Sequence, residues 1–135
     1  MYSPVSLLLY VGLFFVGIAA IIHVVIFRLE SIGWSKPAVW KRFGMRSQED
    51  ADIVKPMAFN QGFYNLFLAV GIVVGVILLA TDAALAGFGV ALFATLSMVA
   101  AATVLVLSNP KLARAAVTQG ALPLLAVLFF LLALI

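Results

Sequence analysis

The chain has 135 residues, of which 66% are hydrophobic and only 10% are charged. A soluble domain has about 45–50% apolar and about 25% charged residues, so this composition excludes a soluble enzyme and a disordered chain and argues against a nucleic-acid partner. The net charge of +3 therefore points to membrane orientation, and the absence of cysteine excludes disulfides and thiolate metal sites.

Four long apolar runs predict an all-α membrane protein built as a bundle of four transmembrane helices. We expect the helices at about residues 4–28, 57–80, 83–107 and 110–135, within a single membrane domain that covers residues 1–135. Each run has the roughly 20 residues that a helix needs to cross a bilayer, and a helix satisfies its own backbone there. The first run exceeds the roughly 7–15-residue core of a signal peptide and follows no basic residue, so we expect a retained helix.

Two of these helices begin with the same local pattern, a capping side chain followed by proline. Ser3 precedes Pro4 at the first run, and Asn109 precedes Pro110 at the fourth. A capping oxygen accepts from the free N–H groups of the first turn, and proline suits the first helical position. The pattern therefore predicts both helix starts.

The long cytoplasmic connection over residues 29–56 contains further helix signals. The stretch Pro37–Phe43 places Trp40 among basic residues, which predicts a short interfacial helix with its aromatic rings toward the lipid. Trp34 is expected in the same aromatic belt. Ser47 is followed by acidic residues, which predicts that the second helix begins outside the membrane and kinks at Pro56.

All eight basic residues lie on one side of the predicted bundle. Six belong to the first connection and its borders, and Lys111 and Arg114 belong to the connection between the third and fourth helices. The six are Arg28, Lys36, Lys41, Arg42, Arg46 and Lys55. Because basic loops face the cytoplasm, we expect a multi-pass protein of the bacterial cytoplasmic (inner) membrane with cytoplasmic basic loops and both termini outside.

Polar groups inside a bilayer are costly and usually functional, and here they gather toward the basic ends of the helices. They are His23, Glu30, Asn60, Gln61, Tyr64, Asn65 and Gln119. Polar groups from separate helices at one depth predict a pocket that opens to the cytoplasm. We assign His23 and Glu30 to proton handling, as candidate catalytic residues, and the other five to ligand binding.

Simpler roles stand beside these assignments. His23 alternatively donates a hydrogen bond to a backbone carbonyl or a neighbouring amide. Metal ligation is disfavoured, because one histidine and one carboxylate about 10 Å apart along a helix make a poor metal site. Glu30 is alternatively an interfacial residue paired with Arg28, Lys36 or Lys55.

The pocket predicts a protein that binds, or transforms, a small amphiphilic or lipid-like molecule. A first alternative is a non-catalytic accessory subunit, because Gly71 and Gly75 form a GxxxG motif that packs either within the chain or against a dimer partner or larger membrane complex. A second alternative is a small homo-oligomeric transporter, although polar residues occupy only one half of the membrane depth. No cofactor or metal motif is found in the sequence, so we expect neither and leave the question of enzymatic activity open.

Several stretches resemble the small bacterial integral-membrane family known as domain of unknown function 1304. They are His23 to Glu30, Trp34, Pro37, Lys41 to Gly44, the block from Asn60 to Ala69, and Gln119 to Pro123. The resemblance covers nearly the whole chain and implies a four-helix membrane protein, but it implies no activity. One departure is Ile22, where the family pattern has an acidic residue, which weakens a proton relay through His23. The architecture is also similar to that of DoxX-like proteins and sterol-isomerase-like bundles, by analogy of fold alone.

Overall fold

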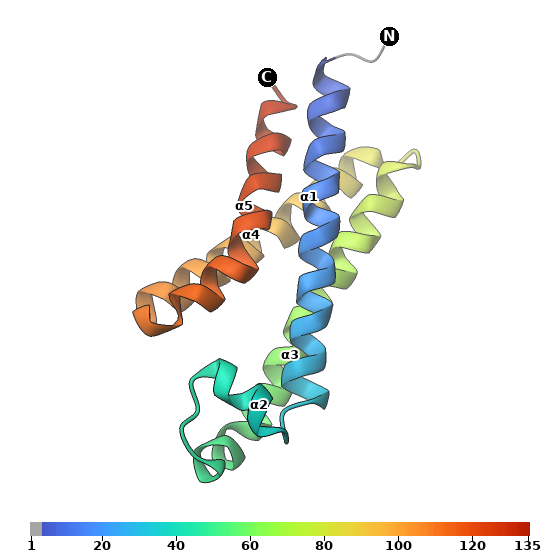
Figure 1. Ribbon diagram of the computed structural model, residues 1–135. Coiled ribbons are helices and arrows are strands. Elements are labelled where there is room, and N and C mark those ends of the chain that lie inside the picture. Colours follow the sequence, from blue (N-terminus) through green and yellow to red (C-terminus); the bar gives the residue numbers. More distant parts are fainter. Residues whose placement is uncertain (1–3) are drawn as a thin grey trace.

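The computed structural model describes residues 4–135, with side chains from residue 7 onward, and it consists of helices joined by short connections and one longer one (Figure 1). The four long helices are α1 (Pro4–Phe27), α3 (Gln48–Leu79), α4 (Ala84–Ser108) and α5 (Ala113–Leu132). No strand occurs within the described residues. Helix α1 begins at Pro4, whereas the predicted Ser3 cap lies outside the described residues.

Each long helix is long and apolar enough to cross a membrane, and only 28% of each candidate span is buried inside the molecule. In water such exposure would be unfavourable, but lipid tails solvate apolar side chains well. The prediction of an all-α four-helix membrane bundle is therefore confirmed, and the helices are those of a multi-pass membrane protein.

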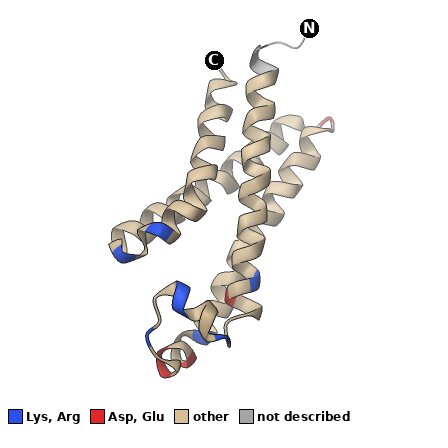
Figure 2. Cartoon of the chain, in the orientation of Figure 1, with Lys and Arg blue, Asp and Glu red and all other residues tan. Residues whose placement is uncertain are grey.

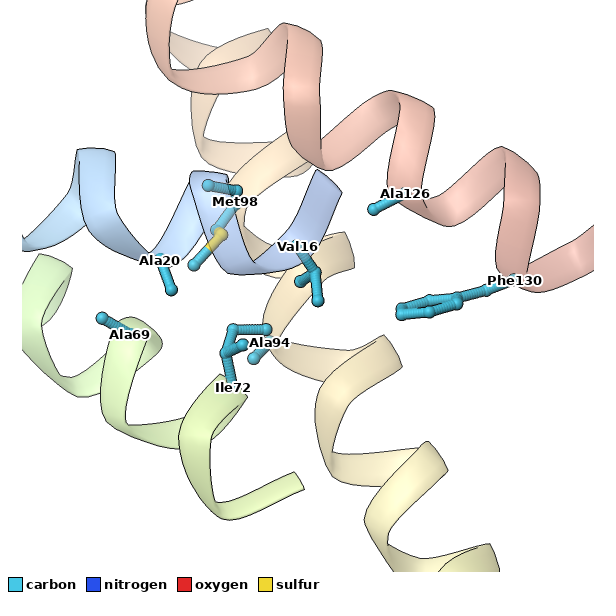
Figure 3. Packing of buried hydrophobic residues seen from close by; sticks show 9 residues of the cluster. Val16, Ala20, Ala69, Ile72, Ala94, Met98, Ala126 and Phe130 are labelled. Atoms are coloured by element: carbon cyan, nitrogen blue, oxygen red, sulfur yellow. The ribbon is translucent and has the colours of Figure 1, made fainter. Parts of the chain in front are cut away.

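The helices form a ring in which α1 packs against α3 and α5, and α4 packs against the same two helices. In Figure 1 the α4–α5 hairpin runs obliquely, and the turn that joins its helices lies to one side of α1 and α3. All four helices contribute to one core, in which Val16, Ile72, Met98 and Phe130 interdigitate among buried alanines (Figure 3). Small residues let the backbones approach closely, as in other membrane bundles.

The GxxxG motif lies inside the bundle, on the contact between α3 and α4. A Cβ atom added at Gly75 would lie 2.7 Å from the Ala91 nitrogen and 2.9 Å from the Gly87 carbonyl oxygen. A Cβ added at Gly71 would lie 3.5 Å from Ala94 Cβ, which is ordinary contact. The motif therefore packs within the chain, and its glycines are not a free dimer face.

A second, smaller core forms where the long connection folds against the start of α3. This connection contains helix α2 (Pro37–Trp40) and the 3₁₀ turn η2 (Lys41–Phe43). Trp34 and Trp40 are each only 4% exposed and pack with Ala51 and Ala58 of α3. The Trp34 indole Nε1 donates to the Ala51 carbonyl oxygen at 2.8 Å.

The short helix at Pro37–Phe43 is confirmed, but the expectation that its aromatic rings face lipid is wrong. Helix α3 has 32 residues, so at 1.5 Å per residue it is about 48 Å long, against a hydrocarbon core of about 30 Å. The helix is therefore longer than one crossing requires, and its first turns offer Trp34 and Trp40 a protein surface to cover.

The early start of α3 depends on a capped first turn. The Ser47 side chain accepts a hydrogen bond from the Asp50 backbone N–H at 3.0 Å, and Glu49 and Asp50 follow where negative charge suits a helix N-terminus. Pro56 lies inside the helix. The fourth span begins similarly, with the 3₁₀ turn η3 (Pro110–Leu112). There the Asn109 side chain accepts a hydrogen bond from the Lys111 backbone N–H at 3.2 Å.

Replacing Ser47 by alanine is expected to destabilise the start of α3 by about 1 kcal/mol, because it removes the cap. Amide hydrogen exchange at residues 48–51 should rise, while exchange in the bundle stays unchanged. Thr103→Ala is the matched control, because the Thr103 hydroxyl only bonds the Val99 carbonyl of its own helix and is exposed. Equal exchange in the two variants would contradict the capping role.

Candidate functional site

The first span ends in an irregular turn that carries a buried acid. After α1 the chain forms a π-helical turn, η1 (Arg28–Ile32), which extends the first candidate span to Ile32. Glu30 lies in this turn and is only 8% exposed. Widened turns of this type occur frequently at functional sites, and a carboxyl at this degree of burial needs a partner.

The partner of Glu30 is an amide from the neighbouring helix. Asn65 on α3 donates from Nδ2 to Glu30 Oε2 at 3.0 Å and to the Gln61 carbonyl oxygen at 3.0 Å, so both amide hydrogens are used. Asn65 is itself only 7% exposed. Within the described side chains Glu30 forms no ion pair. The alternative prediction, that Glu30 pairs with Arg28, Lys36 or Lys55, is therefore wrong.

A glycine lets η1 and α3 approach closely at this point. A Cβ atom added at Gly62 would overlap the Ser31 hydroxyl oxygen and lie 3.1 Å from Glu30 Cβ and from the Ser31 nitrogen. The Ser31 hydroxyl donates to the Phe59 carbonyl oxygen at 2.7 Å, which adds a second polar link between the two elements. The contact therefore holds Glu30 and Asn65 in register.

A cavity of about 360 Å³ adjoins this contact. We call it the Glu30 cavity, and its walls are Glu30, Ser31, Ile32, Trp34, Ser35, Lys55, Pro56 and Phe59. Small-molecule sites occupy roughly 300–1,000 Å³ and combine apolar walls with a few polar groups. One carboxyl, one ammonium and two hydroxyls among apolar walls match that description.

The Glu30 cavity lies at the positively charged end of the molecule. Figure 2 shows the lysines and arginines at the end that carries α2 and the α4–α5 turn, whereas the α3–α4 turn and the C-terminus lie at the opposite end. The first candidate span ends at Ile32, which is a wall residue of the cavity. The cavity thus lies where an apolar span meets the charged end of the chain.

His23 forms the backbone hydrogen bond that the simpler of its two predicted roles requires. Its side chain is 2% exposed, and Nδ1 lies 2.8 Å from the Ala19 carbonyl oxygen of its own helix. Because a carbonyl oxygen only accepts hydrogen bonds, Nδ1 carries the proton of this contact. The other ring nitrogen, Nε2, has no hydrogen bond to a described residue. The described residues contain no group of three or more acidic or histidine side chains that could hold a metal ion.

The remaining polar residues do not meet at Asn65. Asn60, Gln61 and Tyr64 are exposed, and Gln119 on α5 is half-buried without a hydrogen bond to a described residue. At 3.6 residues per turn, the polar side chains between Asn60 and Asn65 are spread over an arc of about 140° around the axis of α3. The four side chains therefore point in different directions, and only Asn65, at one edge of the arc, is buried.

Several wall residues of the Glu30 cavity were missed by sequence reasoning. Ser31, Ser35 and Phe59 carry no motif, and Lys55 was assigned to membrane orientation and to a possible ion pair with Glu30, not to a cavity wall. Gly62 stands in the block that was used for the family resemblance, but no packing role follows from its position alone. The sequence holds no pattern that singles these residues out as walls of one cavity.

Comparisons with known proteins place most of the chain in one family model. The model described as "Protein of unknown function (DUF1304)" matches residues 17–131. Neither the curated proteins nor the solved structures include a match. The matched region contains all the site residues described above.

Proposed function

The chain belongs to the DUF1304 family, and from that premise we propose that it is an integral membrane protein that binds the polar head of a small amphiphile in the Glu30 cavity. Glu30 supplies the fixed polar contact, and Asn65 holds its carboxyl in place from α3. The apolar walls receive the adjoining part of the molecule.

The observation that carries this proposal is a buried carboxyl held by an amide from another helix beside a cavity. A Glu–Asn pair is costly to bury at the end of a membrane span, and a hydrophobic contact would join η1 to α3 more cheaply. Asn65 occupies Oε2, whereas Oε1 has no hydrogen bond to a described residue. The carboxyl therefore retains an acceptor for a ligand.

We further propose that the cavity faces the cytoplasm, in the cell membrane, with both termini on the other side. The support is the charge distribution: all eight Lys and Arg residues lie in or next to the two connections at one end of the molecule, and basic loops remain cytoplasmic. We assign no chemical step. His23 lies two helical turns from Glu30, about 10 Å along the axis, and its Nδ1 bonds its own helix.

Glu30→Gln is expected to lower the amount of bound amphiphile about tenfold or more, because a hydrogen bond to a charged group contributes about 1.5–3 kcal/mol. The test is native mass spectrometry of protein purified from a membrane of mixed glycerophospholipids, scoring all bound lipid together. Asp82→Asn is the control, because Asp82 is an exposed carboxyl in the α3–α4 turn. Equal total lipid on wild type, Glu30→Gln and Asp82→Asn would overturn the proposal.

A further inference from the structure

We propose that the head group taken by the Glu30 cavity carries a primary ammonium and a phosphate, as in an ethanolamine glycerophospholipid. The inference rests on the proposed function and names its ligand class. The ammonium is placed at Glu30 and the phosphate at Lys55.

The first argument is the presence of two opposite, unpaired charges on one cavity. Glu30 comes from η1 and Lys55 from α3, and both line the cavity without forming an ion pair with each other. Charges interact more strongly in a partly buried site than in bulk water. A ligand with a single charge is attracted by one of these two side chains and repelled by the other, whereas a zwitterionic ligand can pair with both.

The second argument concerns hydrogen bonding on the acidic side. Glu30 Oε1 is a free acceptor, and the Ser31 hydroxyl has already given its hydrogen to the Phe59 carbonyl, so its lone pairs remain. This side therefore offers acceptors only. A primary ammonium has three N–H donors, whereas a trimethylated ammonium has none to give.

The third argument concerns the basic side and the walls. Lys55 offers a charged donor that suits phosphate, and Ser35 adds a hydroxyl without a hydrogen bond to a described residue. Ile32 and Phe59 line the cavity and are exposed on its outer side. These two side chains provide an apolar surface along which the acyl chains can leave the cavity. This surface lies at Ile32, the last residue of the first candidate span.

The experiment compares three lipids with identical dioleoyl chains. Purified protein is titrated in detergent with phosphatidylethanolamine, phosphatidylcholine and phosphatidylglycerol, and bound lipid is counted by native mass spectrometry. Wild type should bind the ethanolamine lipid about tenfold more tightly than either competitor, the difference that one good polar contact gives. Glu30→Gln should abolish this preference, because the ammonium is placed at Glu30. Lys55→Gln should instead lower the binding of all three lipids, because each carries a phosphate, and Lys55→Arg should keep most of that binding.

The control variant is Lys111→Gln, which removes an exposed lysine from the same charged end but not from the cavity. It should keep both the preference and the overall lipid binding. Equal binding of the three lipids by wild type, a preference that survives Glu30→Gln, or lipid binding that Lys55→Gln leaves unchanged would overturn the ammonium–phosphate assignment. If Glu30→Gln still lowers total lipid in that case, the proposed function stands, and if it does not, both proposals fail. Far-UV circular dichroism checks that each variant is folded.

Discussion

Gly87→Ala is expected to destabilise the bundle by about 1–3 kcal/mol or more, the range for inserting a group into a packed core. A Cβ atom at Gly87 would lie 2.6 Å from the Leu79 nitrogen and 2.7 Å from the Gly75 carbonyl oxygen. Both obstacles are backbone atoms, so no side chain can rotate away. Helices α3 and α4 must separate where they pack most closely, and the van der Waals contact that joins helices in lipid is lost.

The matched control for this prediction is Gly89→Ala, two residues further along α4. No atom lies within 4 Å of a Cβ added at Gly89, and alanine has the higher helix propensity by about 1 kcal/mol. Gly89→Ala should therefore be neutral or stabilising, whereas Gly87→Ala should be destabilising. The measurement is the loss of far-UV circular dichroism as the protein in mild detergent is titrated with dodecyl sulfate. Midpoints that shift equally in the two variants would contradict the close backbone contact.

Gly62→Ala is expected to disrupt the candidate site together with the contact between η1 and α3. The added methyl group displaces the Ser31 hydroxyl from the Phe59 carbonyl and presses on the Ser31 backbone nitrogen, 3.1 Å away. The lost hydrogen bond and the overpacking together should lower stability by about 1–3 kcal/mol. Because Asn65 stands one helical turn further along α3, its bond to Glu30 should weaken, and bound lipid should fall with it.

Gly71→Ala on the same helix is the comparison for Gly62→Ala. Its added Cβ would make an ordinary contact of 3.5 Å with Ala94 Cβ, so stability and bound lipid should both stay near wild type. A Gly62→Ala variant with unchanged dodecyl sulfate midpoint and unchanged bound lipid would show that the close contact is not needed. Loss of stability without loss of lipid would separate the packing at Gly62 from the site.

The helices were largely predictable because their signals are local. Long apolar runs predict the four spans, and Ser47 and Asn109 predict caps that the structure contains. The π turn of η1 was not predictable, because five residues hold no periodic pattern that separates it from an α-helix. The burial of Trp34 and Trp40 was missed because rings beside lysines are typical of the membrane interface. Only the extension of α3 beyond the span supplies the surface that covers them.

The candidate site was predictable in part, and the missing information was helix rotation. Sequence position gives the depth of a residue along a span, so Glu30 and Asn65 were rightly placed at one level, where the structure joins them. Depth alone also grouped Tyr64 and Gln119 with them, although the first is exposed and the second is half-buried on α5. Which of these side chains faces a neighbour depends on how the helices turn about their axes, and a single sequence does not contain that angle.

The smaller core at the start of α3 has a practical consequence for following this protein in solution. The chain has two tryptophans, and both belong to that core. Indole fluorescence therefore monitors the segment around α2 and does not report on the four long helices. A urea titration followed by tryptophan fluorescence should detect the unfolding of this smaller core, while the four long helices keep their circular dichroism.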